Sequence, residues 1–232
     1  MKRSQQLELM DLPISSQELL AGELKNLRRL NRWLGGYRGI ETALADLVRE
    51  PRPEHLSLLD IGTGSADIPG RVVRWCRRRR IDVSIVALDL DPLATTLAAQ
   101  AVKHYPEISV VRGDAAQPPF APESFDVVLA SQFLHHFSEE QVVALLKNWS
   151  QLARQAVIVS DLLRHPLAYY GAQVLPRLFT RNIMTLTDAP LSILRAFTLS
   201  EWRELCRRAA PDEFRVTPVF PFRVVARLGG SR

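Results

Sequence analysis

The sequence predicts an α/β fold built on an open, doubly wound and mostly parallel sheet. Apolar runs end on aspartates, at Asp60, Asp89 and Asp114, and such near-continuous runs are typical of strands that are buried on both faces. Segments with helical spacing separate the runs, which gives the strand, helix, strand order of a right-handed crossover. Gly62 and Gly64 follow the first run directly and allow a tight turn where a ligand can approach the backbone.

The composition favours one globular domain with additions. The chain has 232 residues, of which 47% are hydrophobic, so it can bury a large core. Its apolar runs are too short to cross a bilayer and no signal-peptide pattern is present, so we expect a cytoplasmic protein without membrane insertion. Cys76 and Cys206 lie far apart, which favours two reduced structural thiols and no metal site. The sequence gives no prediction of the oligomeric state.

Positive charge is concentrated in one run, from Arg77 to Arg80. The formal net charge is +5, and such a run could meet nucleic acid or acidic lipid. Cations at the C-terminal end of a helix also complement its dipole, and this second interpretation needs no partner. Because no aromatic-interleaved basic patch accompanies the run, we expect no nucleic-acid partner.

Residues 1–50 predict a helical cover that precedes the sheet. Leucines recur at helical spacing between residues 19 and 34, and paired glycines then interrupt the pattern. Tyr37 and Arg38 follow the glycines and are candidate substrate contacts on a lid. An ordinary turn between two helices is the alternative.

The loop after the first strand indicates the ligand. A dinucleotide fingerprint needs a glycine at its sixth position, where this chain has Asp67, whose carboxylate would repel a pyrophosphate. No Gly-Lys-Ser/Thr follows to make a phosphate-binding loop. A nucleoside with a positive charge and no phosphate remains. S-adenosylmethionine (SAM) fits this description, since Asp60 and Asp67 would favour its sulfonium and ammonium groups.

The same stretch resembles the first motif of the class I SAM-dependent methyltransferases, Asp-x-Gly-x-Gly-x-Gly. Asp60, Gly62 and Gly64 match the motif, and Ala66 stands at the third glycine. The motif style is nearest to the small-molecule methyltransferases of ubiquinone and menaquinone biosynthesis. The resemblance implies a Rossmann-like, seven-stranded sheet that ends in an antiparallel hairpin, carried by residues 54–232. It also implies that Thr63 lies against SAM.

The later strand ends imply further contacts to SAM. Asp89 follows the loop at close to the ~20-residue interval at which an acidic residue meets the ribose hydroxyls. The resemblance implies that Asp114 accepts from the adenine amine and that the amide of Ala115 approaches the ring. It further implies that Leu90 belongs to the ribose motif and that Ser131 faces the methionine part of SAM.

His135 and His136 follow the fourth strand in a Leu-His-His-hydrophobic pattern, which is common in the ubiquinone-type methyltransferases. Imidazole titrates near working pH, so either ring could be a general base. We name His135 as the candidate catalytic residue and His136 as a candidate substrate contact. A histidine that caps the next helix or packs beneath SAM is the alternative.

Residues 165–196 predict an insertion before the last long helix. Aromatic residues, prolines and apolar residues alternate irregularly there, and the resemblance implies a substrate-covering segment at this place. Arg164 and Tyr169 are candidate substrate contacts, and aromatic walls suit a flat or apolar molecule. A plain pair of packing helices is the alternative. Thr198 and Glu201 then predict a helix start, and residues 214–220 and 222–228 predict the closing hairpin.

These features predict a SAM-dependent methyltransferase for a small aromatic or hydrophobic molecule, such as a phenolic polyketide or a quinone precursor. Either oxygen or carbon could be methylated. Two alternatives stay open. One is a protein or RNA methyltransferase that docks through the run from Arg77 to Arg80, and the other is a SAM-binding protein without turnover.

Overall fold

One mixed sheet of seven strands forms the centre of the computed structural model, which describes residues 1–12, 16–49, 53–210 and 212–229. The strand order is β3-β2-β1-β4-β5-β7-β6. Strands β1 to β5 pair in parallel, and β7 is antiparallel to both β5 and β6. The predicted doubly wound sheet with an antiparallel end is therefore confirmed. The strands are β1 His55–Ile61, β2 Asp82–Asp89, β3 Ile108–Arg112, β4 Phe125–Ser131, β5 Ala153–Leu162, β6 Phe214–Val219 and β7 Arg223–Gly229.

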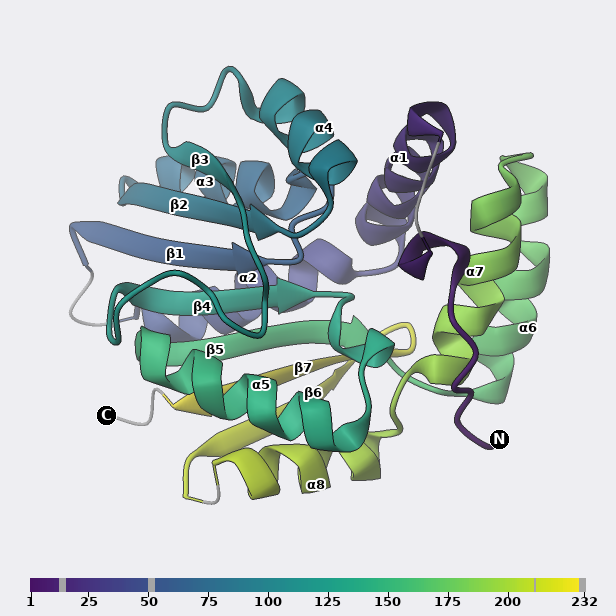
Figure 1. The fold of residues 1–232 in the computed structure, drawn as a ribbon. Helices are drawn as coiled ribbons and strands as arrows, with labels where there is room; N and C mark the ends of the chain where they lie inside the picture. The colour runs from purple at the N-terminus through teal and green to yellow at the C-terminus, as the bar shows by residue number, and fades with distance from the viewer. Residues whose placement is uncertain (13–15, 50–52, 211, 230–232) are drawn as a thin grey trace.

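Helices cover both faces of this sheet (Figure 1). Helices α2 (Gly36–Leu47), α3 (Asp67–Arg79) and α4 (Pro92–Val102) pack on one face. Helices α5 (Glu139–Leu152) and α8 (Leu199–Ala209) pack on the other. Because both faces are covered, the strands are apolar along almost their whole length, as the sequence predicted.

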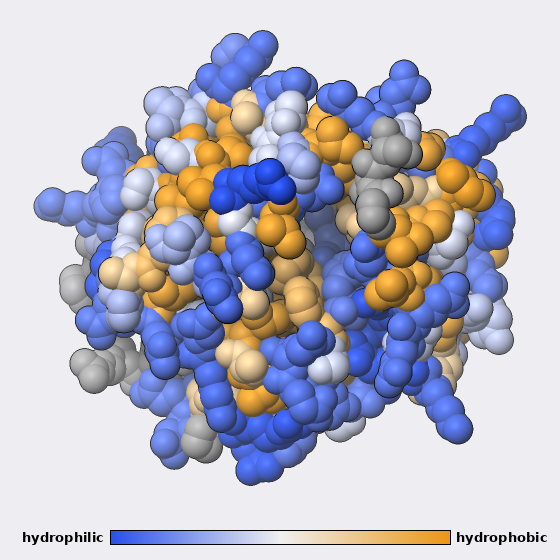
Figure 2. Space-filling model, viewed as in Figure 1, coloured by the Kyte–Doolittle hydropathy of each residue, from blue (hydrophilic) through white to orange (hydrophobic). Residues whose placement is uncertain are grey.

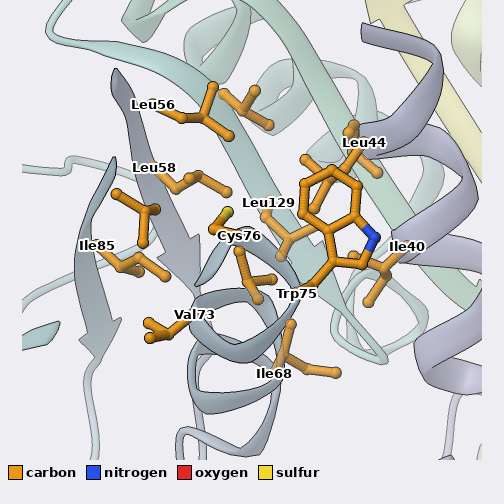
Figure 3. Close-up of a cluster of buried hydrophobic side chains, with 14 of the residues drawn as sticks. Ile40, Leu44, Leu56, Leu58, Ile68, Val73, Trp75, Cys76, Ile85 and Leu129 are labelled. Atoms are coloured by element: carbon orange, nitrogen blue, oxygen red, sulfur yellow. The ribbon is translucent and has the colours of Figure 1, made fainter. Parts of the chain in front are cut away.

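The core on the first face shows why the helix after the glycine loop is amphipathic. Figure 3 shows Cys76 of α3 near Leu58 of β1, whereas Trp75 of the same helix lies beside Ile40 and Leu44 of α2. Trp75 is buried, whereas the arginines in the last turn of the same helix point toward solvent or pair with acidic side chains. Both cysteines are buried and free, as expected.

A second group of helices stands beyond the carboxyl ends of the strands (Figure 1). It contains α1 (Gln17–Trp33), α6 (Pro166–Val174), α7 (Ile183–Arg195) and the short turns η1 (Leu9–Asp11), η2 (Leu134–His136) and η3 (Pro176–Leu178). The predicted N-terminal cover is helical from Gln17 to Leu47, but residues 1–12, here called the N-terminal arm, are extended apart from η1. The boundary predicted between residues 50 and 54 falls mainly on residues 50–52, which lie outside the described residues.

Helix ends follow the sequence signals. Ser16 caps α1 by accepting from the amide of Leu19. Thr198 and Glu201 form the predicted capping box of α8. Within the described ranges, no helix combines the length and the apolar character that a membrane crossing needs.

Candidate functional site

The loop between β1 and α3 folds back onto the end of β2. Gly62 and Gly64 have φ angles of 68° and 54°, which glycine adopts readily. A Cβ at Gly62 would lie 2.4 Å from the ring of Phe133, so the loop also needs a residue without a side chain there. Ala66, in place of the third glycine, has a φ of 52° and costs about 1 kcal/mol of strain.

This loop forms the floor of a cavity of about 250 Å³, called here the first cavity. The amide of Gly64 donates to Oδ2 of Asp89 at 2.8 Å and fixes the loop against the end of β2. The space-filling view is hollowed near the strand ends, with hydrophobic residues around the hollow (Figure 2). The predicted SAM contacts that line the first cavity are Asp60, Gly62, Thr63, Gly64, Asp89 and Ser131.

The first cavity is lined by several carboxyl groups and has buried hydrogen-bonding atoms without a partner among the described residues. Burial raises the pKa of Asp60 to about 8 and also raises the pKa of Asp89. Among the described residues, Oδ2 of Asp60 and the hydroxyls of Thr63 and Ser131 are buried without a hydrogen-bond partner. Such atoms cost free energy unless a ligand pairs with them. These carboxyl and hydroxyl groups therefore fit a positively charged molecule that carries hydroxyl groups, and SAM is such a molecule.

A series of hydrogen-bonded polar side chains forms one wall of this cavity. Asp67 accepts from the hydroxyl of Tyr37 at 2.9 Å and from Asn31 at 3.3 Å. Asn31 in turn accepts from Gln132 and from Arg223. Tyr37 thus holds a carboxylate of the first cavity in place without lining the cavity itself.

A second cavity of about 290 Å³ adjoins the first, because Met10, Leu27, Gln132 and His136 line both. It lies between α1, α6, α7 and the N-terminal arm. Its polar lining includes Glu8, Glu23, His135 and Arg223, all of them buried. Its large apolar side chains include Met10, Leu27, Leu30, Leu34, Leu162, Leu167, Leu175, Ile193 and Phe222.

His135 joins an aspartate at the end of β5. Its Nδ1 lies 2.7 Å from Oδ1 of Asp161, and its backbone amide donates to Oδ2 of the same residue. Although burial alone would raise the pKa of Asp161, His135 beside it lowers that pKa below its ordinary value. The neighbouring carboxylate therefore favours the Nδ1–H tautomer, which leaves Nε2 as the atom that can accept a proton.

His136 and Glu8 complete this end of the second cavity. Nδ1 of His136 lies 2.7 Å from Oδ1 of Asp11. Donor atoms of Glu8, His135 and His136 lie within 4.8 Å of one another, a spacing that a metal ion could bridge. Arg195, however, lies 3.7 Å from Glu8 and 2.5 Å from Asp11, so a fixed guanidinium already supplies positive charge there. We therefore assign no metal to this group.

Several predicted contacts lie away from the first cavity. The side chain of Leu90 is 60% exposed. Asp114 is exposed and accepts from the amide of Ala116, while the carbonyl of Ala115 accepts from Trp149. Among the described lining residues, none of these three borders either cavity. Their contact with SAM stays a prediction.

The predicted substrate contacts are likewise divided. His136 lines both cavities. Arg38 lies instead in a separate groove beside β6 and β7, and Arg164 is paired with Glu201 at 2.5 Å. Tyr169 is on α6 but accepts from Gln173 rather than lining the second cavity, as far as the described residues go.

Sequence reasoning missed four polar residues of the second cavity and its wall. Glu23 offered a signal, because it shares the apolar face of α1 with Leu20 and Leu27, where an acidic residue is unusual. Glu8, Gln132 and Arg223 offered none, since the elements that bring them together are far apart in the sequence.

Comparisons with known proteins agree with this geometry. Residues 58–156 match a family model described as a methyltransferase domain. A 2-phytyl-1,4-naphtoquinone methyltransferase from Thermosynechococcus vestitus is 33% identical over 73 residues, which is 32% of this chain and 31% of that protein. The match thus spans about a third of the length of this relative.

Solved structures share the fold. A SAM-dependent methyltransferase from Aquifex aeolicus has a TM-score of 0.61 at 13% identity, over 89% of this chain and 96% of that one. An O-methyltransferase family 2 protein from Planctomyces limnophilus, in complex with apigenin, has a TM-score of 0.66 at 16% identity, over 94% of this chain and 62% of that one.

Proposed function

We propose that this chain, whose residues 58–156 form a methyltransferase domain within a SAM-dependent methyltransferase fold, methylates a small and largely apolar molecule. The observation that carries the proposal is the pair of adjoining cavities. One is acidic and lined by the glycine loop, and the other is apolar with an Asp161–His135 pair at one end.

The first cavity would hold SAM. Asp60 and Asp67 favour its positive charges, Asp89 can accept from the ribose hydroxyls, and Ser131 can meet the methionine part. When bound, SAM would supply a methyl group on a sulfonium, whose sulfur leaves as a neutral thioether. The residues shared by the two cavities, Met10, Leu27, Gln132 and His136, border the point where donor and acceptor would meet.

The second cavity favours an acceptor with a large apolar part and few polar groups. Leucines supply most of its walls, and its polar side chains are gathered around His135 and Gln132. The names of two related proteins support an aromatic acceptor, because one acts on a naphthoquinone and the other was solved with apigenin. We therefore propose a phenol or a reduced quinone whose hydroxyl lies at the polar end.

His135 would act as the general base. Asp161 fixes its ring and favours protonation of Nδ1, so Nε2 can take a proton from an acceptor hydroxyl. A neutral imidazole that becomes charged in the reaction is then stabilised by the buried carboxylate. The walls of the second cavity would align the acceptor and exclude water.

A macromolecular acceptor is less well supported. The run from Arg77 to Arg80 closes the C-terminal end of α3, which lies at the edge of the sheet opposite the glycine loop. Arg77 is already paired with Glu107 at 2.7 Å. The run would therefore bind its partner far from the two cavities.

A transfer assay tests the proposed function. Incubation with methyl-labelled SAM and a panel of phenols, hydroquinones and quinones should label at least one apolar hydroxyl compound. His135→Gln and Asp161→Asn should each lower kcat by about 10²–10⁴-fold while SAM still binds, as expected for loss of a general base or its partner. Tight SAM binding without transfer to any compound would instead support a non-catalytic binding protein.

A further inference from the structure

The N-terminal arm runs beside α7 (Figure 1), contributes Glu8 and Met10 to the lining of the second cavity, and is fastened by contacts on both sides of Glu8. Arg3 donates to the carbonyls of His135, Phe137 and Arg195, and its guanidinium lies 3.9 Å from the ring centre of Phe197. The amides of Leu9 and Met10, farther along the arm, donate to the carboxylate of Asp188 on α7. Glu8 lies between these two attachments.

The carboxylate of Glu8 is aimed at the cavity. The residue is 1% exposed, and its Oε2 accepts from the hydroxyl of Ser192 at 2.8 Å. Its other oxygen, Oε1, is buried and has no hydrogen-bond partner in the described part of the chain. Oε1 lies 3.6 Å from Nε2 of His135, the atom to which the proposed reaction assigns the proton.

Arg195 does not satisfy this oxygen. Its Nε lies 3.7 Å from Oε1, and its donors are directed to the carbonyls of Gln6, His135 and His136 and to Asp11. The guanidinium thus fastens the arm and lowers the cost of a charge at Glu8. An acceptor atom remains free beside the base, and a buried free acceptor is costly unless a ligand donates to it.

Building on the proposed function, we propose that Glu8 is a second catalytic residue, whose free Oε1 pairs with the proton that Nε2 of His135 takes from the acceptor hydroxyl. The O–H bond breaks and its proton goes to Nε2. An oxygen lone pair forms the new bond to the methyl carbon, and the electron pair of the broken S–C bond stays on sulfur. The carboxylate of Glu8 faces Nε2 and, with Asp161 on the opposite side of the ring, stabilises the imidazolium.

This role makes the charge of Glu8 matter. Burial raises the pKa of Glu8 to about 7, although His136, Ser192 and Arg195 oppose the effect. The active form is the carboxylate, so kcat should rise with pH through about 7. If the charge of Glu8 played no part in the reaction, Glu8→Gln would keep the wild-type dependence of kcat on pH.

Kinetics of Glu8→Gln and Glu8→Ala, with SAM and the best phenol of the panel, test the proposal. We expect kcat to fall at least tenfold at pH 8, the KM for SAM to stay within twofold, and the rise of kcat near pH 7 to be lost. Added formate should restore part of the activity of Glu8→Ala. Glu204→Gln, an exposed carboxylate on α8, is the control and should match the wild type.

Different failures have different meanings. If Glu8→Gln keeps both kcat and the wild-type pH profile, Glu8 has no catalytic role. If Glu8→Gln and Asp188→Asn lose SAM binding and activity to the same extent, and formate restores nothing, Glu8 only fastens the arm. If the wild type binds SAM but methylates no hydroxyl, the proposed function itself fails.

Discussion

Asp89 and Asp114 follow neighbouring strands, yet only Asp89 lines the first cavity. Asp89 is largely buried and accepts from Gly64, whereas Asp114 is exposed and closes its own turn. We expect Asp89→Ala to weaken SAM binding at least tenfold, which is about 1.4 kcal/mol, because the ribose would lose its acceptor. Asp114→Ala tests the predicted contact with the adenine amine in the same way. Calorimetric titration with SAM measures both, and an unchanged affinity of Asp89→Ala would contradict the predicted ribose contact.

The same comparison explains which site residues could be predicted. The carboxyl ends of adjacent parallel strands meet at one edge of a sheet, and this arrangement follows from a local motif. For that reason one cavity is lined by Asp60, Gly62, Gly64, Asp89 and Ser131. Asp114 shares the pattern but follows β3, the outermost strand, so its turn lies beyond the cavity. The residues at strand ends were predictable, whereas which of them line the cavity was not.

Two glycines near the start of α3 should respond differently to substitution, because Gly62 lies in the loop with a positive φ angle and Gly70 lies in the helix. We expect Gly62→Ala to abolish SAM binding and to lower the free energy of unfolding by about 1–3 kcal/mol, because φ is 68° and the new Cβ would meet Phe133. Gly70→Ala, in the first turns of α3, should leave stability unchanged or raise it by up to about 1 kcal/mol. Urea unfolding of the two variants makes the comparison, and similar losses would argue against a strained loop.

The elements themselves were largely predictable, with one exception. The first segment with helical spacing, after the glycine loop, is α3, and the predicted closing hairpin is β6 and β7. The helical cover predicted over residues 1–50 is wrong for the N-terminal arm, which is extended apart from η1. Its conformation is fixed by contacts such as Arg3 with His135 and Asp188 with Met10, which join residues more than a hundred positions apart.

Buried carboxyl groups around the two cavities give the whole molecule a pH-dependent stability. Burial raises the pKa of Asp60 to about 8 and those of Glu8 and Glu23 to about 7. The unfolded chain releases these protons at lower pH than the folded one, so stability falls as pH rises from about 5 to about 8. Asp11 and Asp161 have lowered pKa values, but their contribution is complete above about pH 5.

The free energy of unfolding should therefore depend on pH differently in the SAM-free protein and in its SAM complex, and measurements at pH 6 and pH 8 can show this. Each group still protonated in the fold lowers the free energy of unfolding by about 1.4 kcal/mol per pH unit, so the SAM-free protein should be less stable at pH 8. SAM favours ionised Asp60, so it should stabilise the fold more at pH 8 than at pH 6, at equal saturating concentration. Glu23→Gln should reduce the loss of stability between pH 6 and pH 8 in the SAM-free protein. It should leave the larger stabilisation by SAM at pH 8 in place. Stability that rises from pH 6 to pH 8, or an equal effect of SAM at both, would show that these carboxyl groups are not held protonated in the fold.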